Sequence, residues 1–471
     1  MDNNASSTNP IGPAAPAATP SSTPTPNTNQ ASTDTAPAQS SNDTASDKPR
    51  RLSPVVIGAV GAVAGLVIGA VCAYGITKLN ETPPTTCPEC KCPTLKAASG
   101  DLDYGFLKLE PQNSNIVYSP LSIRNGLALL DAGSSGTTKT EIDKVLGDTE
   151  IPKYQNNNEL SLANAVFIRD NFKNKVLASY TDLIQNQYDG EVVYDSFQSS
   201  NNMDEWVSKK TLNLINSIGI QPNPDLRMVL ANALAIQMDW KYRFDTDDTV
   251  GRTFYQQDGA EIEATTLKEQ FYAEDVKYYK ANNIQAITMP LGQSDDNTDL
   301  EFTAIMPPGN LSEYVSNVSA TDIDDIINNS IPASEPKRGV VAYIPKFKFD
   351  YELNFKGDLM SMGIQTAFNE KTADFSKMAS DPLYVGAAVH KANIDFSEEG
   401  IKAAAVTVFA MNEMTAIAEE PESSVQPIFI EIDHPFLFVI RDKESGAILF
   451  TGTVYEPNLW ADDEASYQPT Y

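Results

Sequence analysis

The segment EEGIKAAAVTVFAMNEMTAIAEE, residues 398–420, has neither the pattern of a resident core strand nor that of an ordinary surface loop. It opens with two glutamates and a glycine, continues through alanines and β-branched residues, and ends polar. No proline occurs from Leu383 to Glu420, although the chain contains 30. Because proline cannot donate to a sheet ladder, this exclusion indicates a backbone that must pair on both sides. The alternative for the segment taken alone is an exposed, alanine-rich helix, because alanine has high helix propensity.

Side-chain size along the segment favours a strand that enters a gap between existing strands. Ala403, Ala404 and Ala405 are small enough to slide into such a gap, and the β-branched residues that follow suit a pleated sheet. Gly400 supplies the hinge in this interpretation, because glycine adopts backbone conformations that other residues avoid. The pattern therefore predicts a segment that can join a sheet.

The charge of the chain limits its partners. The formal net charge is −29, and the whole of the acidic excess lies after residue 100. Such a surface repels phosphate and sulfate polyanions, which argues against nucleic acid and against heparin. Apolar residues make up 41% of the chain, enough for a sizeable core.

The N-terminal hundred residues are organised differently from the rest. Residues 1–51 are rich in Pro, Ala, Ser and Thr and are predicted to be a disordered tail. Residues 52–77 carry no charge and are long enough to cross a bilayer as a helix. The basic cluster at residues 48–51 predicts a single-pass protein with a cytoplasmic N-terminus and an extracellular domain. A cleaved signal peptide is the alternative, although this segment is long for one.

All four cysteines precede residue 100, and three of them lie in a stalk at residues 78–100. In an oxidising exterior, Cys87, Cys90 and Cys92 can form one local and one intermolecular disulfide, which would give a linked dimer. Metal binding is the alternative, but the second CxxC half of a zinc site is missing.

Residues 101–460 have the pattern of a globular α+β domain built on antiparallel sheet, followed by a C-terminal tail at 461–471. TTKTEIDKVLG, ending at Gly147, predicts a short helix that starts with a Thr138–Glu141 capping box. Alternation in LYVGAAVHKANIDF predicts a strand over residues 383–396. The apolar runs from residue 428 to 455 predict further strands, the last two joined by a turn near Gly446.

Catalytic motifs are missing from this domain. Its only histidines are His390 and His434, and the sequence contains no GxSxG elbow, HExxH motif, phosphate loop or candidate cysteine nucleophile. We therefore expect no enzymatic activity, no cofactor and no metal.

Six motifs in the same order resemble the serpins, a family of serine protease inhibitors, over residues 101–457. They are SPLSIRNGLALLDAG at 119–133, LANALAIQMDWKYRFD at 230–245, YIPKFKFDYELNFKGDLMSMGIQTAF at 343–368, AVHKANIDFSEEG at 388–400, the 398–420 segment, and DHPFLFVIRDKESGAILFTGTVYEP at 433–457. The resemblance implies the serpin fold, with a large antiparallel-rich central sheet, surrounding helices and an exposed reactive loop.

The resemblance also implies a mechanism. A serine protease attacks the loop and forms an acyl-enzyme, and the loop then inserts into the central sheet and traps the protease before deacylation. Papain-like cysteine proteases form a further target class. The loop hinge maps to Glu398, Glu399, Gly400, Ile401, Ala403, Ala404, Ala405 and Thr407, and the shutter and breach of the sheet map to Ser119, Ser122, Asn232, Trp240 and His390.

The reactive bond follows from the family spacing. Counting from Gly400 places it between Met414 and Thr415, which suits the apolar pocket of an elastase-, chymotrypsin- or subtilisin-like protease. Cleavage beside Glu413, Ala416 or Ile417 is an alternative, and a serpin-fold protein that binds without inhibiting is the alternative function.

Two departures from the family accompany this interpretation. Ile401 replaces the usual small hydroxyl residue at the start of insertion, which could slow the switch. The connection from Gly147 to Leu162 is too short for the helix that binds heparin in some serpins. We therefore do not expect activation by heparin.

Overall fold

The computed structural model describes residues 101–148, 151–292, 299–401 and 426–463. All of them belong to the compact unit Pro93–Tyr471, whereas the unit Met1–Cys92 lies outside the described residues, and with it the predicted tail, the 52–77 span and the stalk cysteines. Among the described helices, none is both long and apolar enough to cross a bilayer.

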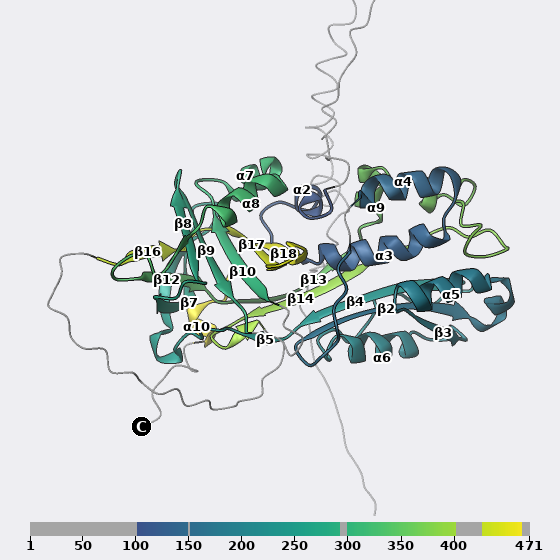
Figure 1. Cartoon of the computed structure of the whole chain (residues 1–471), viewed down its shortest axis with the longest axis horizontal. Helices are drawn as coiled ribbons and strands as arrows, with labels where there is room; N and C mark the ends of the chain where they lie inside the picture. The colour runs from purple at the N-terminus through teal and green to yellow at the C-terminus, as the bar shows by residue number, and fades with distance from the viewer. Residues whose placement is uncertain (1–100, 149–150, 293–298, 402–425, 464–471) are drawn as a thin grey trace, which may run out of the picture. The chain divides into compact units, whose positions relative to one another are not determined.

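A seven-stranded sheet forms one layer of the domain (Figure 1). Every neighbouring pair for which a register is defined is antiparallel, as in Glu301↔Arg441 between β10 and β17. In spatial order its strands are β1 (Ile116–Tyr118), β18 (Ile448–Val454), β17 (Phe436–Asp442), β10 (Leu300–Met306), β9 (Ile284–Pro290), β8 (Lys277–Ala281) and β11 (Ile331–Pro332).

The first strand after residues 402–425, β16, belongs to a four-stranded sheet. Its edge strand β16 pairs in parallel with β12, and the other pairs are antiparallel. In order, the strands are β16 (Ile428–Glu431), β12 (Val340–Pro345), β7 (Glu261–Phe271) and β6 (Val250–Tyr255).

The remaining strands form two sheets that face each other edge to edge. The first has the order β3 (Glu191–Asp195), β2 (Leu160–Arg169) and β4 (Met228–Ile236). The second has the order β13 (Phe347–Leu353), β14 (His390–Phe396), β15 (Gly400–Ile401) and β5 (Met238–Asp239). The chain passes from β4 through Gln237 directly into β5. At the β5 end, β15 lies between β5 and β14 and pairs with both. Along β4, in contrast, no strand of the described residues lies between β4 and β14, and the two do not pair with each other.

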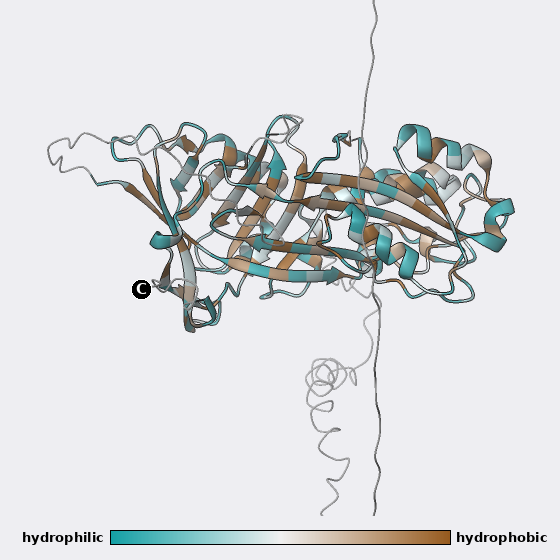
Figure 2. Cartoon of the chain, turned by 90° about the horizontal axis from the view of Figure 1, so that it is seen from below, coloured by the Kyte–Doolittle hydropathy of each residue, from teal (hydrophilic) through white to brown (hydrophobic). Residues whose placement is uncertain are grey.

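Helices cover the sheets on both sides (Figures 1 and 2). α3 packs on β4 and β18, and α6 packs on β2 and β4 from the opposite face. Brown hydrophobic colour in Figure 2 runs along the strands, and teal marks the outer helix surfaces and loops. The helices are α2 (Gly105–Leu109), α3 (Pro120–Gly133), α4 (Gly136–Leu146), α5 (Ala178–Gln187), α6 (Asn201–Lys210), α7 (Leu311–Asn317), α8 (Ala320–Asn328), α9 (Lys356–Met362) and α10 (Trp460–Asp463), with 3-10 turns at Asp170–Lys175, Thr246–Asp248 and Thr366–Phe368.

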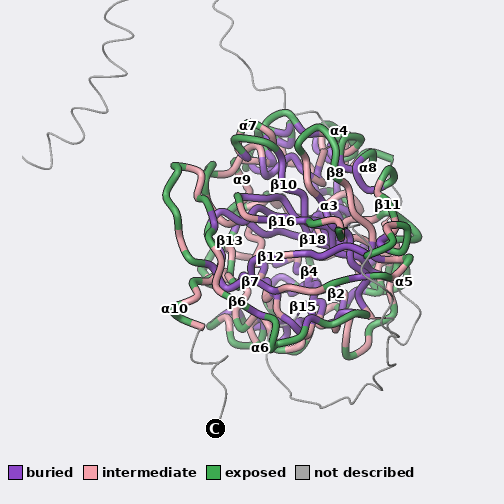
Figure 3. The backbone as a smooth tube through the Cα atoms, turned by 90° about the vertical axis from the view of Figure 1, so that its left-hand side faces the viewer, coloured by how far each residue is buried: buried purple, intermediate pink, exposed green. Residues whose placement is uncertain are grey.

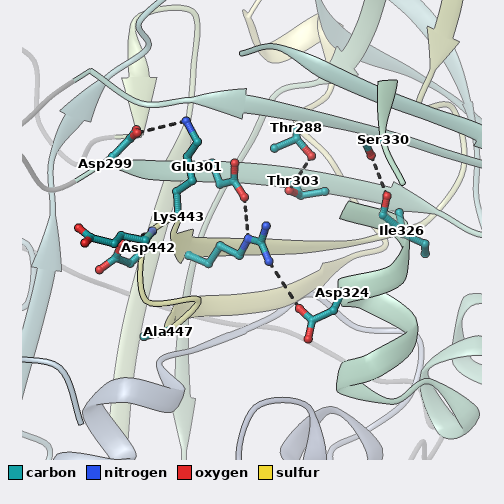
Figure 4. Close-up of polar contacts among 12 residues, drawn as sticks. Thr288, Asp299, Glu301, Thr303, Asp324, Ile326, Ser330, Asp442, Lys443 and Ala447 are labelled. Atoms are coloured by element: carbon teal, nitrogen blue, oxygen red, sulfur yellow. Dashed lines mark hydrogen bonds and ion pairs between the residues drawn. The ribbon is translucent and has the colours of Figure 1, made fainter. Parts of the chain in front are cut away.

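The core between the layers is apolar, and Figure 3 shows the buried backbone in purple along the central strands. An ion pair between Arg441 and Glu301 is buried within it. Arg441 on β17 donates from Nε to Glu301 Oε1 on β10 at 2.6 Å, and from Nη1 to Asp324 Oδ1 on α8 at 3.5 Å. The two acceptors, Glu301 and Asp324, are labelled in Figure 4. The side chains of Arg441 and Glu301 are only 13% and 5% exposed. This pair fixes the register of the two strands and ties α8 to the sheet.

The predicted strands from residue 428 onward are confirmed, and the last two are joined by a turn in which Gly446 has φ +73°. The helix at 119–133 is also confirmed as α3, capped by the Ser119 side chain. The strand predicted over 383–396 is correct only from His390, because the partner strand β13 ends opposite it at Leu353.

The Thr138–Glu141 capping box is wrong. α4 begins at Gly136, so Thr138 lies inside the helix, where its fully buried hydroxyl contacts Thr366 Oγ1 at 3.0 Å. Glu141 Oε2 instead accepts from the backbone N–H of Thr366 at 2.7 Å. Both side chains therefore hold a distant segment and do not cap their own helix. Residues 151–159, the described part of the connection to β2, contain no helix, as the short spacing predicted.

Candidate functional site

The hinge is a tight turn that folds the chain back beside β14. Ser397 donates its N–H to the Gly400 carbonyl at 3.1 Å, and Ile401 then pairs with Phe396 on one side and Met238 on the other. Ile401 is 4% exposed and packs with the apolar core. The first two residues of the hinge strand thus already lie inside the sheet.

Position 400 must be glycine because the backbone of β5 lies too close to it for any side chain. Its φ is not positive, so the conformational freedom assumed from the sequence is not what selects glycine here. A Cβ atom at this position would lie 2.2 Å from Met238 O and 2.6 Å from Asp239 Cα, and no rotamer change can move backbone atoms away. Only glycine lets β15 pair with β5 in this register.

Trp240, at the end of β5, holds the hinge turn from the other side. Its indole N–H donates to the Ser397 carbonyl at 2.8 Å, and its backbone N–H donates to the Glu399 carbonyl at 2.9 Å. The ring is 3% exposed and packs edge-on against Phe396, with centroids 5.2 Å apart. The turn is therefore fixed by hydrogen bonds and by an aromatic cluster.

Glu398 is a buried carboxylate at the tip of this turn. Its side chain is 7% exposed and accepts from Thr249 Oγ1 at 3.1 Å, while Oε2 lies 3.4 Å from Lys346 Nζ. A buried charge is tolerated only when it is paired and hydrogen-bonded. Lys346 and Thr249 were not predicted as site residues, although a lysine within the apolar run YIPKFKF was a usable signal.

Below the hinge, a line of two small adjoining cavities follows the unpaired edges of β4 and β14. Its upper part is apolar and is bounded by Ile401 at the top and by the connector after α6 on the outside. The lining residues are Leu214, Ile215, Leu234, Ala235, Ile236, Ala392, Asn393, Ile394, Ile401, Ile440 and Phe450. β15 already occupies the upper end of this gap, where it pairs with β14 and β5.

The lower part of the gap is polar and contains the predicted shutter residues. It is lined by Ser122, Asn232 and His390, among others. Ser122 Oγ hydrogen-bonds Asn232 Oδ1, and Asn232 Nδ2 donates to Asn164 Oδ1 at 2.8 Å. Asn164, on β2, was not predicted. These side chains link α3 to β4 across the base of the gap.

His390 completes this group from β14. The backbone N–H of Ser119 donates to His390 Nε2 at 3.0 Å, so the ring nitrogen is an acceptor and the imidazole is neutral. His390 as a whole residue is half-buried, and burial of its imidazole lowers the pKa of His390 from 6.5 to about 4. Protonation would destroy this acceptor and place a charge between α3 and β14.

The structure therefore brings the predicted residues together in two groups. The first comprises Glu398, Glu399, Gly400, Ile401 and Trp240 at the hinge, and the second comprises Ser119, Ser122, Asn232 and His390 at the base of the gap. The predicted loop residues Ala403, Ala404, Ala405 and Thr407 and the bond Met414–Thr415 lie outside the described residues.

Comparison with known proteins defines the class. Residues 104–457 match the family model for "Serpin (serine protease inhibitor)". "Serine protease inhibitor 88Ea" of Drosophila melanogaster is 29% identical, covering 73% of this chain and 86% of its own length. "Serpin-Z1B" of Triticum aestivum is 28% identical, covering 74% and 91%. The crystal structure of the thermophilic serpin tengpin in the native state superposes with a TM-score of 0.64 at 24% identity, covering 80% of this chain and 97% of tengpin.

The chain belongs to the serpin family. The family is one of protease inhibitors and generally not of catalytic enzymes, in agreement with the missing catalytic motifs.

Proposed function

We propose that this protein is a suicide inhibitor of extracellular serine proteases and acts by inserting its cleaved loop between β4 and β14. The observation that carries the proposal is the two-residue strand β15, which occupies the top of a gap with unpaired edges on both sides. A protease that cleaves the loop would release its C-terminal tether. The hinge strand could then lengthen down the gap while the acylated protease is still attached.

The register of β15 defines which residues of β4 and β14 each inserted loop residue would pair with. Ile401 pairs with Phe396 and Met238, and in an antiparallel ladder each following residue moves one step along both partners. Ala403 would then lie opposite Ile394 and Ile236, and Thr407 opposite His390 and Asn232. β4 is long enough to pair the strand as far as residue 411, roughly 33 Å beyond the hinge at about 3.3 Å per residue.

The loop sequence matches the polarity of the gap in this register. Alternate residues 401, 403 and 405 are apolar and would face the apolar upper part of the gap. Thr407, the first inward polar residue, would reach the polar lower part that contains Asn232 and His390. A slip by one residue would turn Lys402 inward, so the match holds in one register only.

Met414–Thr415 remains the proposed reactive bond, with elastase-, chymotrypsin- or subtilisin-like proteases as proposed targets. Residues 52–77 are proposed to anchor the chain in a membrane with the inhibitor outside, and the stalk cysteines are proposed to link two chains. Protease protection on intact cells tests the topology. A domain that is digested only after lysis would reverse it.

The inhibitory function is tested by mixing the protein with elastase, chymotrypsin and subtilisin and looking for complexes that survive SDS. We expect Ala405→Arg to convert the inhibitor into a substrate, because the inserted strand would carry a charge into the apolar upper gap. Ala404→Arg is the matched control. It has the same charge and size one residue earlier, on the face shared with Lys402, and should retain most of the complex.

Equal complex formation by both variants would refute insertion in this register. Clean cleavage of the wild-type protein by all three proteases, with no complex, would favour the alternative, a serpin-fold protein that binds without inhibiting.

A further inference from the structure

The chain continues beyond the region that matches the family model, and residues 458–463 of this continuation are described by the structure. The match ends at residue 457, whereas α10 occupies Trp460–Asp463. Leu459 bridges to Ala264 of β7. Trp460 lies against Gly251 of β6, where an added Cβ would come within 2.7 Å of the indole. Residues 458–463, called the strap below, therefore lie on the β6–β7 pair.

The strap closes a ring of three backbone hydrogen bonds. Lys346 donates its N–H to the Thr265 carbonyl at 2.8 Å, Asn458 donates to the Lys346 carbonyl at 2.8 Å, and Thr265 donates to the Asn458 carbonyl at 3.0 Å. Asp463 Oδ2 reinforces the ring by accepting from Thr265 Oγ1 at 2.9 Å and from Asn458 Nδ2 at 3.4 Å. Thr265 is fully buried.

This ring positions the residue that pairs with the hinge. Lys346 joins β12 to β13, and its ammonium group lies 3.4 Å from the buried carboxylate of Glu398. Without Asn458, the Lys346 carbonyl and the Thr265 N–H would lose their partners, and the backbone that carries the lysine would gain freedom. The strap is thus two contacts away from the hinge turn, through Asn458–Lys346 and Lys346–Glu398.

We propose that the strap is a conformational lock on the loop hinge, which acts by fixing Lys346 against Glu398. The lock keeps β15 seated between β5 and β14 in the uncleaved protein. Its loss frees the turn at 397–400 and raises the rate at which the hinge opens. Asn458 and Asp463 are positioning residues in this arrangement, because they reach the hinge only through Lys346.

Hydrogen exchange, measured without a protease, tests this lock by comparing truncated chains with the full-length protein. Removal of residues 458–471 should accelerate amide exchange at Gly400 and Ile401 by about tenfold relative to the full-length protein, the effect of losing one hydrogen bond to a charged group. The matched control removes only residues 464–471, keeps the strap, and should exchange at the wild-type rate. The point variant Asp463→Ala should show a smaller acceleration, and it replaces the truncation if the shortened chain does not fold.

The route through Lys346 is tested by combination. In a Lys346→Met background the hinge should already exchange faster, and removal of the strap should add nothing. A strap effect that persists undiminished in Lys346→Met, or unchanged hinge exchange after truncation and in Asp463→Ala, would overturn the proposal. Because the measurement needs no protease, failure of the protein to inhibit would leave this inference standing.

Discussion

Replacement of Gly400 by alanine should expel the hinge from the sheet. The new methyl group would lie 2.2 Å from Met238 O and 2.6 Å from Asp239 Cα, so β15 must separate from β5. Separation exposes Ile401, worth about 2–3 kcal/mol of apolar burial, and breaks backbone pairing worth about 1 kcal/mol. The equilibrium between the seated and open hinge should therefore shift by about 3–4 kcal/mol, which is a factor of about a hundred to about a thousand.

Amide exchange at residues 399–401 measures this shift directly, and limited proteolysis at the hinge provides a second readout. Gly386→Ala is the matched control, because a Cβ atom at Gly386 meets nothing within 4 Å and its φ is not positive. If Gly400→Ala kept wild-type protection at Ile401, the close approach of β15 to β5 would not determine the hinge position, and the reasoning would be refuted.

Three further predictions follow from the same structure. The native pKa of His390, about 4, is below its unfolded value of 6.5, so the unfolded state binds more protons between these two pH values. The free energy of unfolding should therefore fall by about 3 kcal/mol as the pH drops from 6.5 towards 4. Paired denaturation curves of the wild-type protein and of His390→Gln, which lacks this titration, measure the loss. Arg441→Leu should cost about 3–5 kcal/mol because it leaves Glu301 buried and unpaired, and adding Glu301→Leu should restore most of the loss in urea unfolding. Cleavage within residues 410–417 should raise the melting temperature by tens of degrees if the loop enters the sheet, and an unchanged midpoint would contradict insertion.

Local sequence patterns predicted the elements whose signals are local. The resemblance of residues 119–133 to a serpin helix indicated α3, and the alternation around Ile394 indicated β14. The errors arose where the role of a side chain is determined by residues distant in the sequence. Thr138 matched a capping pattern, but its hydroxyl serves a segment more than two hundred residues away, and the pairing of Lys346 with Glu398 required strands that only the fold brings together. Gly400 was singled out from the sequence for its conformational freedom, whereas the structure places the backbone of β5 against it, a contact that no local pattern reveals.

The short strand β15 changes the kinetics expected for growth of the sheet. Nucleating a strand is slow, because the chain loses conformational entropy before any stabilising pairing forms. Extending an existing strand orders only one residue at a time, and each residue pairs as it is ordered. With Ile401 already paired on both sides, the nucleus exists before any cleavage. Growth would then be a one-ended zippering reaction that cannot begin elsewhere, so an obstacle at one residue would arrest every residue beyond it. A series of bulky substitutions at successive inward positions would therefore stop the strand at successive depths and measure the order in which the gap closes.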